Sequence, residues 1–144
     1  MENYLWLVYA LLSAVAAAMV SVFGKIGLQG LDAHTATAVR AVIMAAFLVA
    51  VAVFQPRWEH LPELWADKRA MTFILLSGVA GALSWLFYFT ALKYGKVSQV
   101  APVDKLSVVL AATAAVVFLH ETVSVMSAAG IGLITAGIIL VALG

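Results

Sequence analysis

The sequence predicts an all-α membrane protein, a bundle of five transmembrane helices in a single domain over residues 1–144. Hydrophobic residues make up 65% of the chain and charged residues only 10%, and the mean hydropathy is +1.11. A soluble domain of this size could not bury so much apolar surface. The apolar residues also form five continuous runs, each about as long as the 20 residues that cross a bilayer. The approximate runs are Tyr4–Gly24, Ala33–Phe54, Ala70–Leu92, Ser98–Leu119 and Val123–Leu143.

The runs are expected to be helices rather than strands of a barrel. They show no alternation of apolar and polar residues at a period of two, which membrane strands require. Backbone groups in lipid must also bond one another within the segment, which leaves the helix. We expect the first run to be retained rather than cleaved as a signal peptide. Only Glu2 carries charge before it, and the run is longer than a typical signal core.

Turn-forming residues separate the runs. The segment Gly27–Asp32 follows the first run, and Pro56 is expected to end the second because proline cannot continue a helix. A tight link around His120 separates the fourth run from the fifth. Thr122 and Ser124 are the candidate caps of the fifth helix, because hydroxyl side chains accept hydrogen bonds from the first turn.

The longest connection, Gln55–Arg69, is amphipathic. Its large apolar residues recur at helical spacing among charged residues, which is typical of a short helix lying at the headgroup level with tryptophan anchors. A loop that binds a partner protein is the alternative. The apolar residues are Trp58, Leu61, Leu64 and Trp65.

Small residues form a stripe on the first predicted helix and another on the fifth. Such stripes let two helix backbones approach closely. They indicate packing within the chain, and for the fifth helix a subunit interface is an equal alternative. The stripes are Ser13, Ala17 and Ser21, and Ala128, Gly132 and Ala136 with Gly137 nearby.

Three charged residues lie inside the runs, where charge is costly and therefore informative. Arg40 lies on the second helix, and Asp104 and Lys105 lie on the fourth. All three are about 9 Å from the same membrane face at 1.5 Å per residue. Asp104 is a natural partner for Arg40, which leaves Lys105 for a ligand or another neighbour; a purely structural ion pair is the alternative. Pro102 either breaks the fourth helix near the site or is an ordinary first-turn residue.

Two aromatic residues of the third helix, Trp85 and Tyr88, reach the level of these charges, and Lys25 lies above them on the same face. The two aromatic side chains line a cavity or, equally, face lipid or the core. The intramembrane charge of +1 from Arg40, Asp104 and Lys105 favours an anion or a zwitterion. The candidate substrate-binding residues are therefore Lys25, Arg40, Trp85, Tyr88, Asp104 and Lys105.

Several classes of site are not expected. The chain has no cysteine, which excludes disulfides, thiolate metal sites and cysteine nucleophiles. His34, His60 and His120 fall in different connections, and no Ser–His–acid or metal-ligand pattern accompanies them. No basic run of the kind that binds nucleic acid is present. We therefore expect no enzyme, no catalytic residue, no metal, no cofactor and no nucleic-acid partner.

The orientation in the membrane is not set by loop charge. Five spans place the two termini on opposite sides, and Lys and Arg normally collect on the cytoplasmic side. Here the count is balanced, which favours either insertion in both orientations (dual topology) or another determinant. One side carries Arg57, Lys68 and Arg69, and the other carries Lys25, Lys93 and Lys96.

Five short segments, in order and at their spacing, resemble the EamA-type transporters of the drug/metabolite transporter superfamily. The likeness runs from Leu7 to Leu143 and is greatest to the single-domain, five-helix bacterial and archaeal subgroup. The segments are Lys25–Leu28, Thr37–Arg40, Ser84–Leu92, Val100–Ser107 and Phe118–Glu121.

The resemblance implies that the chain is one half of a ten-helix, inverted-repeat transporter. It would then act as a homodimer, with antiparallel packing favoured, in the cytoplasmic (inner) membrane of a bacterium or archaeon. The implied function is secondary transport of a small organic metabolite, anionic or zwitterionic, coupled to protons. The alternative is a non-transporting membrane subunit that assembles with a paralogue or an enzyme.

One feature departs from the small multidrug relatives of that family, which carry a membrane-embedded glutamate in the first helix. Here Ser13 and Ser21 are the polar side chains of that helix before Lys25. Antiport of cationic drugs is therefore not expected. Glu121 matches the family's acidic residue at the turn before the last helix, and we interpret it as a cap and loop tie.

Overall fold

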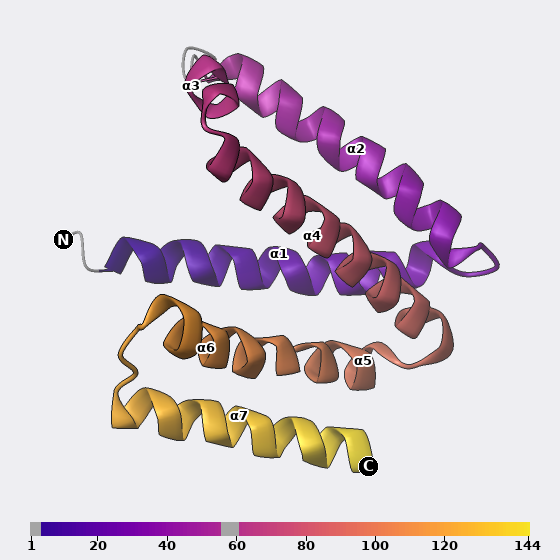
Figure 1. The fold of residues 1–144 in the computed structure, drawn as a ribbon. Helices are drawn as coiled ribbons and strands as arrows, with labels where there is room; N and C mark the ends of the chain where they lie inside the picture. The colour runs from indigo at the N-terminus through magenta and orange to yellow at the C-terminus, as the bar shows by residue number, and fades with distance from the viewer. Residues whose placement is uncertain (1–3, 56–60) are drawn as a thin grey trace. The chain divides into compact units, whose positions relative to one another are not determined.

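A computed structural model describes residues 4–55 and 61–144, and over these residues the chain is helical with no strand. Five helical segments are long and apolar enough to cross a membrane, as predicted, so the chain is a multi-pass membrane protein. The fourth segment is divided into α5 and α6. The helices are α1 (Leu5–Gly27), α2 (Ala33–Phe54), α3 (Leu61–Ala66), α4 (Lys68–Tyr94), α5 (Val97–Asp104), α6 (Leu106–Leu119) and α7 (Val125–Leu143) (Figure 1).

The turn between α1 and α2 is built on Gly30 and Asp32. Gly30 has a φ of 75°, a left-handed conformation that favours glycine. The Asp32 carboxylate caps α2 by accepting hydrogen bonds from the backbone N–H of Thr35 at 2.8 Å and from its hydroxyl at 3.0 Å. These bonds lower the pKa of Asp32. The stabilisation they give is therefore present above the unfolded-state pKa and lost as the pH falls through the folded-state pKa.

The connection between α2 and α4 contains α3, a helix of six residues. The short helix predicted for this connection is therefore present, and its place at the headgroup level stays a prediction. Trp65 is 68% exposed, as an interfacial anchor would be. The predicted helix stop at Pro56 and the anchor at Trp58 lie outside the described residues. Asp67 accepts a hydrogen bond from the backbone N–H of Ala70 at 3.0 Å, which supports the start of α4.

The fourth span is broken at Lys105. Pro102 is the sixth residue of α5, so its interpretation as a first-turn residue is wrong. Because proline has no N–H, the Ser98 carbonyl loses its donor four residues ahead. At Lys105 the ψ angle is −2°, against about −42° in a regular helix. The backbone N–H of Lys105 donates to the Pro102 carbonyl at 3.0 Å, and the N–H of Val108 donates to the Lys105 carbonyl at 2.9 Å. Both bonds span three residues instead of the four of an α-helix, so the helix is more tightly wound here.

The link between α6 and α7 turns at His120, which has a left-handed φ of 54°. The backbone N–H of Glu121 donates to the Ala115 carbonyl at 3.2 Å. The side-chain role of Glu121 as a loop tie stays a prediction. Of the two predicted caps of the last helix, Ser124 is the one used, since its hydroxyl accepts from the backbone N–H of Ser127 at 3.1 Å.

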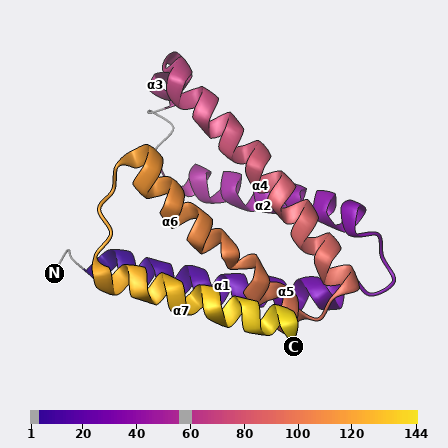
Figure 2. The same ribbon diagram turned by 60° about the horizontal axis from the view of Figure 1, so that its bottom comes forward.

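The chain divides into two compact units. In the unit Phe23–Lys93, α2 and α4 run in opposite directions, joined through α3 (Figure 1). In the unit formed by Met1–Val22 and Tyr94–Gly144, α7 runs back along α5 and α6 and packs against both (Figure 2). Most large apolar side chains of the described helices are exposed, which suits segments whose surroundings are lipid or further helices.

Candidate functional site

The guanidinium of Arg40 lies over the ring of Trp85. Arg40 is the eighth residue of α2, about 10 Å along the helix from its start. Its Cζ is 3.6 Å from the centroid of the Trp85 ring and 4.7 Å from that of Phe89. Trp85 and Phe89 are four residues apart on α4 and so share one face. The two rings place electron-rich faces against a cation that lipid would otherwise destabilise.

Trp85, Tyr88 and Phe89 form an aromatic cluster on α4. The Trp85 and Tyr88 rings meet edge to face with centroids 5.9 Å apart, and Phe89 lies 5.7 Å from Trp85 and 6.0 Å from Tyr88. Phe89 is 3% exposed. A Cβ atom on Gly24 of α1 would lie 2.6 Å from Cε1 of Phe89, so only glycine lets this ring approach so closely. Sequence reasoning missed both Gly24 and Phe89.

The hydrogen-bonding capacity of Arg40 is only partly used. Nη2 donates to the thioether sulfur of Met44, one turn along α2, at 3.1 Å. Thioether sulfur is a weak acceptor. Nη1 is buried and has no acceptor among the described residues. An unsatisfied buried donor costs free energy, so an acceptor that reached this guanidinium would be bound favourably.

A groove of about 650 Å³ lies between α2 and α4, with Arg40 and Trp85 among its lining residues. Along α2 it extends from Thr37 past Met44 to Leu48. The α4 wall includes Gly78 and Gly81, where an added Cβ would meet no atom within 4 Å. The remaining lining residues are Ala38, Ala41, Ala45, Ala82 and Leu86.

Lys25 lies at a different place in the same unit. Its Nζ donates to the carbonyl of Leu92, which is fully buried near the end of α4. Lys25 lines a second cavity of about 480 Å³ beside the turn from α1 to α2, with Asp32 and Lys93 among its other lining residues. The lysine thus ties the end of α1 to the end of α4 instead of lining the groove.

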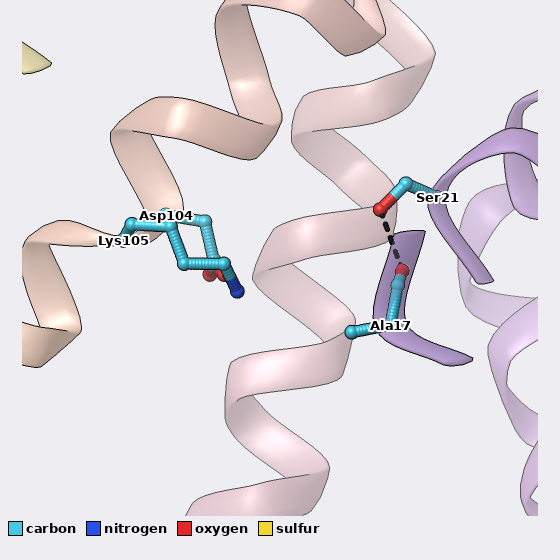
Figure 3. Close-up of polar contacts among 4 residues, drawn as sticks. All are labelled: Ala17, Ser21, Asp104 and Lys105. Carbon is cyan, nitrogen blue, oxygen red and sulfur yellow. Dashed lines mark hydrogen bonds and ion pairs between the residues drawn. The ribbon is translucent and has the colours of Figure 1, made fainter. Parts of the chain in front are cut away.

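Asp104 and Lys105 contact each other in the other unit. The Lys105 ammonium lies 3.2 Å from Oδ2 of Asp104, and their side chains are 54% and 33% exposed respectively (Figure 3). Neighbouring residues on a regular helix do not face each other; the break at Lys105 coincides with this contact. The same figure shows the Ser21 hydroxyl donating to the Ala17 carbonyl at 3.0 Å, a bond within α1.

The predicted site residues therefore fall into three groups. The structure brings Arg40 together with Trp85, and Tyr88 packs against that tryptophan without lining the groove. Lys25 ties the end of α1 to the end of α4 in the same unit, through its hydrogen bond to the Leu92 carbonyl. Asp104 and Lys105 belong to the other unit, so the Arg40–Asp104 pair and a cavity shared by all six residues stay predictions. No cluster of three potential metal ligands occurs among the described residues.

Comparison with known proteins gives two matches over nearly the whole chain. Residues 4–143 match the EamA-like transporter family. An "Uncharacterized transporter in cobO 3'region" from Sinorhizobium sp is 39% identical over 137 residues, which cover 95% of this chain and 96% of that protein. No solved structure gives a significant match.

Proposed function

Because the chain belongs to the EamA-like transporter family, we propose that it is a secondary transporter of a small organic metabolite that is anionic or zwitterionic. The observation that carries the proposal is Arg40. A guanidinium within a membrane-spanning helix, lying on Trp85 with an unused buried donor and lining a groove, is a costly arrangement. Such residues mark substrate pathways more often than packing positions.

The size and lining of the groove support this assignment. Small-molecule sites typically have volumes of about 300–1,000 Å³ and apolar walls with a few polar groups, and this groove has about 650 Å³. Arg40 supplies the polar group. The guanidinium recognises a carboxylate or phosphate through paired, directional hydrogen bonds.

We propose the proton as the coupling ion and Asp104 as its carrier. Asp104 is the one acidic residue in the five spanning segments, all of which the structure describes. Its carboxylate lies 3.2 Å from the Lys105 ammonium and is partly exposed. A change in the charge of this carboxylate would therefore act at the break between α5 and α6.

We also propose that two copies form the working transporter in a bacterial or archaeal cytoplasmic membrane. The matched relative is covered over 96% of its length, so almost all of that protein corresponds to this five-helix unit. Transporters of this type place the substrate between two repeats that move against each other. A second copy, antiparallel by the balanced loop charges, would supply the second repeat.

The proposal is tested with the purified protein alone in proteoliposomes. A panel of radiolabelled organic anions and zwitterions is applied with a proton gradient, and at least one solute should show protein-dependent uptake that dissipating the gradient reduces. Arg40→Gln should abolish that uptake, whereas Thr113→Ala on α6, whose hydroxyl donates to the Val109 carbonyl of the same helix, should retain it. A protein that takes up no solute would instead favour the non-transporting subunit.

A further inference from the structure

We infer that the groove between α2 and α4 selects organic anions with one carboxylate and a hydrocarbon body, in preference to zwitterions and polyhydroxylated solutes. The inference rests on the proposed function, because it names the substrate class of the same site. It follows from three features of the groove: the free donors of Arg40, the chemistry of the other lining residues, and the open space beside two glycines.

The first feature is the way in which Arg40 is held. The guanidinium carbon lies 3.6 Å from the centroid of the Trp85 ring, and the N–H donors lie in the plane of the group. A carboxylate in the groove would replace the weak Met44 sulfur on Nη2. Nη1 is buried and lacks an acceptor, so a small shift of the guanidinium toward the carboxylate would bring this donor to it as well. Two parallel, charge-assisted hydrogen bonds are the strongest arrangement available to this side chain.

The second feature is how few polar partners the groove offers to groups other than an anion. Among the described residues that line the groove, Arg40 is the one charged residue. The hydroxyl of Thr37 already donates to the Ala33 carbonyl at 2.7 Å. An ammonium group entering the groove would meet the like charge of Arg40 and few acceptors, and a row of hydroxyls would exceed the few polar partners present, so much of their hydration would be lost without compensation. A zwitterion is therefore disfavoured relative to the anion that has the same body.

The third feature is the space along the α4 wall. A Cβ added to Gly78 or Gly81 would meet no atom within 4 Å, so these positions border open volume. Gly81 lies four residues from Trp85 and so on the same face of α4. The groove continues along α2 from Arg40 to Leu48, about 12 Å at the rise of a helix. A hydrocarbon body attached to the bound carboxylate fits along this wall.

The test measures equilibrium binding to the whole purified protein in nanodiscs, which needs no transport. The probe is radiolabelled 3-phenylpropionate, with phenylalanine as the competitor that adds only an ammonium group and propionate as the one that lacks the ring. We expect both to compete at least about tenfold less well than unlabelled 3-phenylpropionate. Equal competition by phenylalanine, or no binding of the probe, would overturn the inference.

Two substitutions locate the binding. Arg40→Gln should weaken probe binding by about tenfold or more, since it removes a charge-assisted pair of hydrogen bonds. Gly81→Leu fills the open side of the groove and should weaken it similarly, even if Arg40→Gln fails to fold. The matched control is Gly130→Leu on α7, where an added Cβ also meets nothing within 4 Å. Unchanged binding in Gly81→Leu would overturn the inference.

The outcomes separate this inference from the proposed function. Selective binding that depends on Gly81, without flux of any solute, supports the groove assignment and contradicts transport. Protein-dependent uptake of other solutes, with no binding of 3-phenylpropionate, supports transport and overturns the substrate class.

Discussion

Replacing Gly24 by alanine should destabilise the protein by forcing Phe89 out of position. The added Cβ would lie 2.6 Å from Cε1 and 2.9 Å from Cζ of that ring. Carbon atoms prefer separations of about 3.5–4.0 Å, so the ring must move by about 1 Å. Phe89 is 3% exposed and is bordered by Trp85, Tyr88 and the Arg40 guanidinium. The ring cannot move without displacing them.

The expected magnitude is the difference between two opposing terms. Overpacking a filled site costs about 1–3 kcal/mol, whereas alanine is favoured over glycine within a helix by about 1 kcal/mol. Gly24→Ala should therefore lower the free energy of unfolding by about 0–2 kcal/mol. Gly130→Ala, where the new Cβ meets nothing within 4 Å, should gain the helix term alone. The difference between the two variants, about 1–3 kcal/mol, isolates the contact with Phe89.

The assay is unfolding of the purified protein by dodecyl sulfate in mixed micelles, followed by tryptophan fluorescence. Combining Gly24→Ala with Phe89→Leu should recover part of the loss, because leucine lacks the ring atoms that clash. Such recovery is a coupling energy in a double-mutant cycle. Equal stability of Gly24→Ala and Gly130→Ala would refute the packing of Phe89 against α1.

The remaining predictions concern charge and assembly. Asp104→Asn should reduce proton-driven transport, and its effect on folding should add to that of Arg40→Gln, because Asp104 contacts Lys105 and Arg40 keeps its donors for a ligand; partial rescue of folding in the double variant, measured by yield and unfolding, would instead support the Arg40–Asp104 pair. Lys105→Met should abolish transport in proteoliposomes while leaving the assembled protein intact, and unchanged kinetics would contradict a role for Lys105 in transport. Two lysines added near Glu2 should lock one orientation and abolish transport, and a co-expressed copy with lysines after Gly144 should restore it. Undiminished transport by the locked form alone would replace the antiparallel dimer by a parallel one.

Much of the fold could be predicted because each spanning segment carries its own signal. The apolar runs located five spans, and the hydroxyl rule identified Ser124 as one of two candidate caps. The cap at Asp32 could also have been predicted, because Asp32 stands immediately before the second apolar run and Thr35, whose N–H it accepts from, follows three residues later. The helix break at Lys105 was harder to predict from the sequence. Whether Pro102 disturbs the helix depends on how many residues of α5 precede it.

The candidate site could be predicted only in part, because its contacts depend on how helices cross. Depth along the chain placed Arg40 level with Trp85, and the structure joins them. Equal depth and opposite charge favoured Asp104 as the partner of Arg40, but depth does not tell which face of a helix a residue occupies. Periodicity alone could have added Phe89, four residues after Trp85 on the same face. Its approach to Gly24 is a tertiary contact that no local pattern encodes.

The central claim, that solute crosses the membrane through the groove beside Arg40, is tested most directly by blocking the groove in an active protein. The chain has no cysteine, so Gly81→Cys introduces a single reactive thiol. Labelling it with a methanethiosulfonate reagent in proteoliposomes should abolish the uptake of radiolabelled solute, and the transported solute should slow the labelling. Gly130→Cys labelled to the same extent should keep its uptake. Complete labelling at position 81 with undiminished uptake would contradict the account.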